Sequence, residues 1–124
     1  QLKTDMCVAW AICAASNSNS ISIANDGTLV ANAVGHPDRA AACESAIMQA
    51  RQAKHTDLLK GAAAASDSFF TFADGVDSLA RRKIKALLAT SGSLHDAEIA
   101  EHARQFDMIF HTVPDTQGRI FNGH

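Results

Sequence analysis

No hydrophobic stretch of this sequence comes near the ~20 residues that a membrane-spanning helix requires. Its first ten residues, QLKTDMCVAW, do not have the apolar segment of a secretory signal peptide. Basic residues are not in excess, because 11 Lys and Arg stand against 13 Asp and Glu. Nucleic acids and acidic membrane surfaces usually require a basic patch. We therefore expect a cytoplasmic protein that binds neither membranes nor nucleic acid.

Cysteine is also scarce, and the spacing of the cysteines does not match that of a metal site. The three cysteines are Cys7, Cys13 and Cys43, and no C-x-x-C pair occurs. Cys13 and Cys43 fall on apolar helical positions, so reduced thiols buried in the core are the expected reading. The H-x-E and P-C-x-x-C motifs of zinc deaminases and the G-x-x-x-x-G-K phosphate loop are missing as well. We expect no metal.

What is present is enough apolar material for one folded unit. With 124 residues and 47% apolar residues, the chain predicts a single domain over 1–124. Two short apolar runs, ISIA and LVANAV, flank NDG, which is a strong hairpin signal. The segments GAAAAS, IKALLA and MIFHT predict three further strands.

Helices are predicted between these strands. Thr4 or Asp5 is expected to cap the first, Pro37 suits the first turn of the second, and Ser93 forms a capping pattern with Asp96 for the last. A short helix is expected from about 75 to 82. The order α-β-β-α-β-α-β-α-β predicts an α/β fold with a mixed sheet between helices. The expected inner faces of the first two helices are Met6, Ala9, Trp10, Cys13 and then Cys43, Ala46, Ile47, Ala50, Ala53.

An unusual concentration of phenylalanine lies in SDSFFTFADG, residues 66–75, which holds three of the six Phe. The run follows a predicted buried strand and precedes a helix, where ligands of open α/β sheets bind. Phe69, Phe70 and Phe72 could stack on a planar ring there, with Asp74 accepting hydrogen bonds from ring nitrogens or amines. The alternative is that the three rings fold back into the core or into an interface between subunits.

Four segments in order resemble one family. They are SNSISIANDGTLVANAVGHPDR, ASDSFFTFADGVD, TSGSLHDAEIAEHA and GRIFNGH. Together they are similar to the AICAR transformylase domain of the bifunctional purine-biosynthesis enzyme. That domain is a tandem pair of cytidine-deaminase-like units, and this chain resembles the C-terminal unit alone. The resemblance implies a cytidine-deaminase-like three-layer sandwich. It also implies formyl transfer from 10-formyltetrahydrofolate, as co-substrate, to a purine-precursor nucleotide.

The resemblance also implies roles for single residues. Asn19 and His124 are expected near the formyl-transfer site. Arg39 falls on the Arg of the family's G-Q-x-S-R motif, and Asp74 on an acid that faces the folate. Aromatic faces hold flat heterocycles, and a guanidinium grips phosphate through a planar fork. The implied ring and phosphate contacts are Phe69, Phe72, Phe121 and Arg119.

Two function classes stay open, because the chain departs from the family. His36 replaces the usual Gln, and Glu44 stands where the family carries a basic residue. Formyl transfer in the family depends on a Lys-His pair in the first unit, which this chain does not contain. Lys54-His55 lies at the end of a predicted helix in another context, and we expect it to be solvated there. The chain is therefore either a formyltransferase-like half whose site is completed by a homodimer or a partner chain, or a non-catalytic unit. Such a unit would bind a purine-like or folate-like ligand, or only dimerise.

Overall fold

The computed structural model describes residues 1–14, 19–67, 70, 74–92 and 94–114. Within them the predicted order of helices and strands is confirmed, with one added turn of 3-10 helix. The elements are α1 (Leu2–Ala14), β1 (Ile21–Asn25), β2 (Thr28–Ala33), α2 (Arg39–Gln52), η1 (Thr56–Leu58), β3 (Ala63–Ser66), α3 (Asp74–Arg81), β4 (Ala86–Ser91), α4 (Asp96–Gln105) and β5 (Ile109–Pro114).

The described strands form one mixed sheet in the order β2-β1-β3-β4-β5. β1 is antiparallel to both β2 and β3, whereas β3, β4 and β5 run parallel. The hairpin between β1 and β2 turns at Asp26 and Gly27, whose φ angles are 53° and 72°. Both residues have the left-handed conformation that a two-residue hairpin turn requires, which is why NDG predicts this turn correctly.

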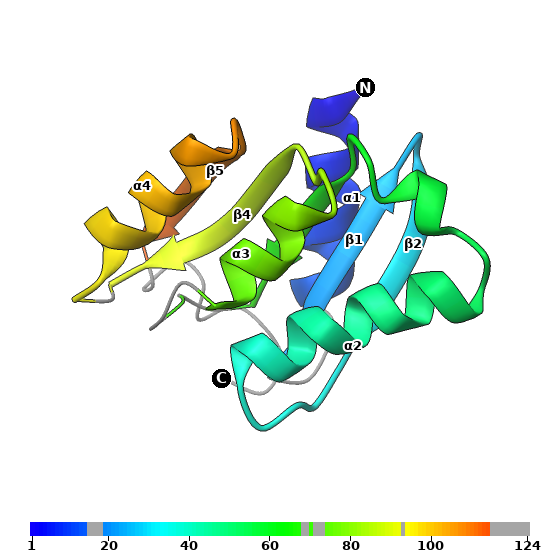
Figure 1. Cartoon of the computed structure of the whole chain (residues 1–124), viewed down its shortest axis with the longest axis horizontal. Helices are drawn as coiled ribbons and strands as arrows, with labels where there is room; N and C mark the ends of the chain where they lie inside the picture. The colour runs from blue at the N-terminus through cyan, green and yellow to red at the C-terminus, as the bar shows by residue number, and fades with distance from the viewer. Residues whose placement is uncertain (15–18, 68–69, 71–73, 93, 115–124) are drawn as a thin grey trace.

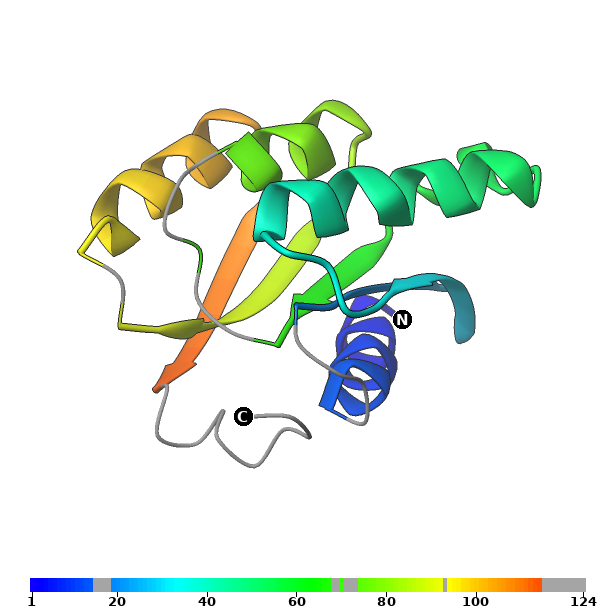
Figure 2. The same cartoon turned by 90° about the horizontal axis from the view of Figure 1, so that it is seen from below.

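Helices cover both faces of the sheet and make three layers (Figures 1 and 2). Figure 2 shows α2, α3 and α4 side by side on one face and α1 alone on the other. The larger apolar cluster lies under α2, α3 and α4 and includes Ile21, Ile23, Leu79, Leu87 and Ile99. A smaller cluster of mostly small side chains lies under α1. The Ala-rich β3 is buried throughout, since its four residues are covered from both faces.

The first helix starts earlier than its sequence predicts, and Asp5 does not cap it. α1 begins at Leu2, so Asp5 lies inside the helix, where it is 1% exposed. Its carboxylate accepts hydrogen bonds from the backbone N–H groups of Asp26 at 3.0 Å and Gly27 at 2.7 Å. The carboxylate therefore holds the hairpin turn against α1. A local capping pattern could not show this contact, because the partner lies about twenty residues away in the sequence.

The start of α2 also differs from its prediction. Asp38 is the N-cap, and its side chain accepts a hydrogen bond from the N–H of Ala41 at 2.7 Å, so the helix begins after Pro37. At the other end Ala53 is the exposed C-cap and not part of the buried stripe.

Helices α2, α3 and α4 all end in the same way. The residue after the cap of each helix has a positive φ: 61° at Lys54, 65° at Lys83 and 57° at Asp107. The next N–H returns to a carbonyl of the last turn, from His55 to Ala50 at 2.7 Å for example. This is the hydrogen-bond pattern of a Schellman motif, whose left-handed residue is usually glycine. Lys54 is exposed, so the expected solvation of Lys54-His55 is confirmed for the lysine. It is wrong for His55, which is only partly exposed and whose Nδ1 is buried with no hydrogen-bond partner among the described residues.

Candidate functional site

Three connections meet at the edge of the sheet where β3 ends. Asn19 precedes β1, Arg39 opens α2 shortly after β2, and Asp67 follows β3. Because β1 is antiparallel to both neighbours, its amino end lies beside the carboxyl ends of β2 and β3. Two of the predicted site residues, Asn19 and Arg39, are thus brought to one place. Asp67, which the sequence analysis did not assign to the site, lies there too.

A buried ion pair is the centre of this edge. Arg39 Nη1 contacts Asp67 Oδ1, and the side chains are 15% and 0% exposed. The same carboxylate oxygen accepts a hydrogen bond from the N–H of Ser20 at 3.1 Å. A carboxylate that leaves water needs such partners, because an isolated buried charge is strongly unfavourable. The pair therefore fixes the start of α2 against the end of β3, and part of the Arg39 charge is used within the protein.

Asn19 extends the strand pairing beyond the hairpin. Its N–H and carbonyl exchange hydrogen bonds with His36 at 3.4 Å and 3.1 Å, and its side-chain Nδ2 donates to the His36 carbonyl at 2.9 Å. These three bonds hold the segment that leads into α2. A catalytic role for Asn19 stays a prediction, since the described contacts of its side chain are structural.

The Phe-rich segment is partly a core segment. Phe70 is 1% exposed and belongs to the larger apolar cluster. Gly75, in the first turn of α3, makes room for it: a Cβ at Gly75 would lie 3.0 Å from both the Phe70 ring and the Cys43 Sγ. For one of the three rings the core alternative is therefore correct. Phe69 and Phe72 lie outside the described residues, as do Arg119, Phe121 and His124.

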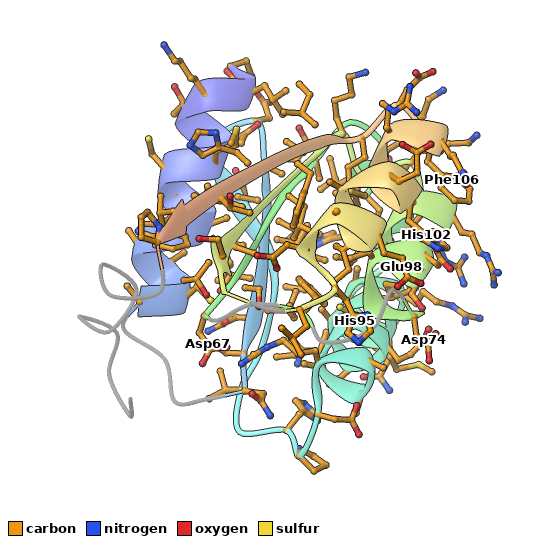
Figure 3. All side chains as sticks on the ribbon, turned by 90° about the vertical axis from the view of Figure 1, so that its left-hand side faces the viewer. Asp67, Asp74, His95, Glu98, His102 and Phe106 are labelled. Atoms are coloured by element: carbon orange, nitrogen blue, oxygen red, sulfur yellow. The ribbon has the colours of Figure 1, made fainter. Side chains whose placement is uncertain are left out.

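Asp74 is exposed at the first position of α3. A carboxylate is favourable there because the helix N-terminus carries partial positive charge. Figure 3 shows Asp74 on α3, well apart from Asp67. The described contacts therefore do not join Asp74 to the cluster of Asn19, Arg39 and Asp67. Its predicted contact with a folate remains a prediction.

A second polar group, which the sequence analysis did not assign, links α3 to α4. His102 Nδ1 lies 3.0 Å from Asp77 Oδ1, with both side chains partly exposed. At the other end of the helix, His95 is the N-cap of α4, and its Nδ1 lies 3.3 Å from Glu98 Oε2. Figure 3 shows His95, Glu98 and His102 together along α4. Spacing along α4 alone does not predict the first pair, because its acid comes from α3.

The buried thiols near the site are not reactive groups. Cys13 and Cys43 are free and buried, as predicted, whereas Cys7 is exposed. Burial raises the pKa of the Cys13 thiol to about 11, and a hydrogen bond with Ser20 only partly offsets this shift. Burial also raises the pKa of the Cys43 thiol. Both groups therefore hold their protons at neutral pH, and neither is suited to act as a nucleophile.

Curated proteins of similar sequence test the resemblance that the sequence motifs predict. PurH of Thermotoga maritima, the bifunctional purine biosynthesis protein, is 36% identical over 117 residues, which cover 94% of this chain and 24% of PurH. PurH of Mycobacterium leprae is 38% identical over 100 residues, covering 81% of this chain and 18% of that protein. The chain is a relative of one part of PurH. The predicted resemblance to the purine-biosynthesis enzyme is confirmed, and the chain spans about a quarter or less of the curated relatives that it matches. No family model matches the sequence.

Solved structures show the same fold with little sequence identity. RibD of Acinetobacter baumannii superposes with a TM-score of 0.63 at 15% identity, over 98% of this chain and 38% of RibD. A diaminohydroxyphosphoribosylaminopyrimidine deaminase/reductase of Thermotoga maritima gives 0.63 at 17% identity, over 97% and 39%. The predicted cytidine-deaminase-like α/β fold is therefore confirmed for this PurH-like chain. Within the described residues, no helix is long and apolar enough to cross a membrane.

Proposed function

We propose that this PurH-like chain is one half of a formyltransferase site, completed by a second copy or by a partner chain. The observation that carries the proposal is the 36% identity to PurH over 94% of the chain. The convergence of Asn19, Arg39 and Asp67 at the carboxyl end of β3 supports it, because that edge is where open α/β sheets bind ligands.

In the proposed reaction the amine of a purine-precursor nucleotide attacks the formyl carbon of 10-formyltetrahydrofolate. The new C–N bond forms, the bond from the formyl carbon to N10 breaks, and the amine proton leaves for N10 or a base. Asn19 would stabilise the developing charge on the formyl oxygen. Arg39 and Asp67 would position the segment that carries Asn19, and Arg119 would bind the phosphate. The proton shuttle would come from the other half.

Among the described residues, part of one face of the sheet has no helix over it, and this supports a partner. Phe110 packs into the larger core cluster, so its neighbours Ile109 and His111 face the other side of β5. On that side, α1 covers the sheet as far as Leu88 of β4. Ile109 is 47% exposed and His111 is exposed. Another unit would bury this face, and we propose a homodimer or a partner chain as that unit.

The test is isothermal titration calorimetry of the full chain with the aminoimidazole carboxamide ribonucleotide and, separately, with a reduced folate. Arg119→Ala is the test variant, because it lies outside the Arg39–Asp67 pair. Arg51→Ala, an exposed arginine at the end of α2, is the charge-matched control. We expect nucleotide binding about tenfold weaker in Arg119→Ala and unchanged in Arg51→Ala. Absence of binding of both ligands at millimolar concentration would show that no working ligand site remains.

A non-catalytic ligand-binding unit is the second candidate function. The observation that favours it is the engagement of Arg39 by Asp67, which reduces the positive charge offered to a phosphate. Nucleotide binding without any formyl transfer, in the presence of every proposed partner, would select it.

A further inference from the structure

The amino ends of β3, β4 and β5 form a second edge of the sheet, at the opposite end of β3 from Asp67. Three helix-to-strand connections meet there, and backbone hydrogen bonds fix them to one another. Gly61 N donates to the Lys83 carbonyl and Lys85 N to the Ala62 carbonyl, both at 2.8 Å. Ile109 N donates to the Lys85 carbonyl, also at 2.8 Å. Figure 3 shows Phe106 beside the start of β5, at the far end from Asp67.

This edge contains an open cavity of about 310 Å³. The residues that line it include three lysines and one aspartate, so the formal charge of the lining is positive. Lys85 Nζ donates to the main-chain oxygen of Asp107 at 3.1 Å, which holds that ammonium at the cavity. Within the described part of the chain, Lys60 and Lys83 form no ion pair. The cavity is lined by Lys60, Gly61, Lys83, Ile84, Lys85, Phe106 and Asp107.

An aromatic residue lines the same cavity. Phe106, the C-cap of α4, is 46% exposed, whereas Ile84 is 3% exposed and forms the apolar floor. A half-exposed ring in a lysine-lined cavity offers an apolar face to any ligand that the charges attract. The cavity volume is at the lower limit of small-molecule sites.

Lys83 has a backbone conformation that is unfavourable for any residue other than glycine. Lys83 has a φ of 65° in the Schellman motif after α3, where glycine is usual. A residue with a side chain loses roughly 1 kcal/mol in that conformation compared with glycine. Gly61 occupies a left-handed position on the same edge, with open space where a Cβ would lie. Three left-handed positions therefore line this cavity: Lys83 and Asp107 carry charged side chains, and Gly61 carries none.

We propose that this cavity binds a small organic phosphate that carries an aromatic ring. The three lysines would bind the phosphate, since ammonium groups are common phosphate ligands. Phe106 would contact the ring. The site is separate from the one at the carboxyl end of β3, so it does not depend on the proposed formyl transfer.

The structure provides matched variants for a test. Lys83→Gly removes one cavity charge and also relieves the left-handed backbone. Lys54→Gly, after α2, removes the same charge and relieves the same conformation, but Lys54 does not line the cavity. Asp107→Gly does the same at the third Schellman position and removes the single cavity carboxylate. All three variants should fold, because each gives glycine a position that favours it.

Titration of the full chain with phenyl phosphate, followed by calorimetry or by NMR, measures the binding, and inorganic phosphate is the ringless comparison. We expect phenyl phosphate to bind Lys83→Gly about threefold to fivefold more weakly than the wild type. Binding to Lys54→Gly should not change, and Asp107→Gly should bind more tightly. Inorganic phosphate should bind more weakly than phenyl phosphate. Equal affinities of Lys83→Gly and Lys54→Gly, equal affinities for the two probes, or no binding at about 10 mM phenyl phosphate would each overturn the proposal.

Discussion

Replacing Asp67 with Asn should destabilise the protein by about 2–3 kcal/mol. The substitution keeps the shape of the side chain and leaves an oxygen to accept the hydrogen bond from Ser20, which is 3.1 Å from the present carboxylate. It removes the charge that pairs with Arg39. Breaking a fully buried pair costs about 3–5 kcal/mol. We expect a smaller loss because the Arg39 side chain is 15% exposed and regains some water.

Urea denaturation measures this loss. With an m value of about 1–3 kcal/mol/M for a chain of this size, the midpoint should fall by about 0.7–3 M urea at constant m. Asp57→Asn is the control, because Asp57 is exposed in η1 and should change stability by less than about 0.5 kcal/mol. A loss below about 0.5 kcal/mol in Asp67→Asn would refute the argument that this carboxylate holds α2 against β3.

A double variant separates the pair from its surroundings. Arg39→Met with Asp67→Leu replaces both charges by apolar groups, which is often neutral or stabilising for a buried pair. We therefore expect the double variant to be less destabilised than the sum of its two single variants. Additive single losses would mean that the two side chains do not interact energetically.

Three further predictions concern groups outside this pair. Asp5→Ala leaves two N–H groups of the hairpin turn without their buried acceptor, so it should cost about 2–3 kcal/mol by urea denaturation, whereas Asp5→Asn should cost less. The raised thiol pKa of Cys13, about 11 when folded, means that the unfolded chain loses its proton first as the pH rises. The contribution of Cys13 to stability is therefore full below pH ~9 and falls by up to about 2–3 kcal/mol by pH ~11. Denaturation of Cys13→Ala across that range should show a fall that is smaller by this amount, and the loss due to Cys43 should persist. Gly75→Ala should lower stability by about 1 kcal/mol in spite of the better helix propensity of alanine, because its Cβ would press on Phe70 and Cys43; a gain in melting temperature would show that the core yields there.

Local signals in the sequence predict most of the fold. NDG predicts the hairpin turn because two consecutive left-handed residues are rare outside such turns. Alternating strand and helix segments predict the mixed sheet, and the Ala-rich run 61–66 predicts the buried strand β3. Asp5 shows where this reasoning fails, since an acid near a helix start has the pattern of a cap whatever its distant partners are.

The candidate site is predicted only in part, for a similar reason. Asn19 and Arg39 are identified by family motifs, and the structure brings them together. Asp67 stands just before the Phe run in the sequence, and no periodicity indicates that it meets Arg39 across 28 positions of sequence. The Phe70 ring is buried in the core because Gly75 and Cys43 leave room for it there. Contacts of this kind follow from packing between elements, which a local pattern does not encode.

The most direct test of the half-site proposal is single-turnover formyl transfer from 10-formyltetrahydrofolate to the aminoimidazole carboxamide ribonucleotide. The reaction should be followed with the chain alone and with the chain mixed with a separate unit that carries the Lys-His pair. Half a site without a proton shuttle should give no transfer alone and transfer in the mixture. Turnover by the chain alone at an ordinary enzyme rate of ~1–1000 per second, or an inactive mixture of two folded units, would contradict the account.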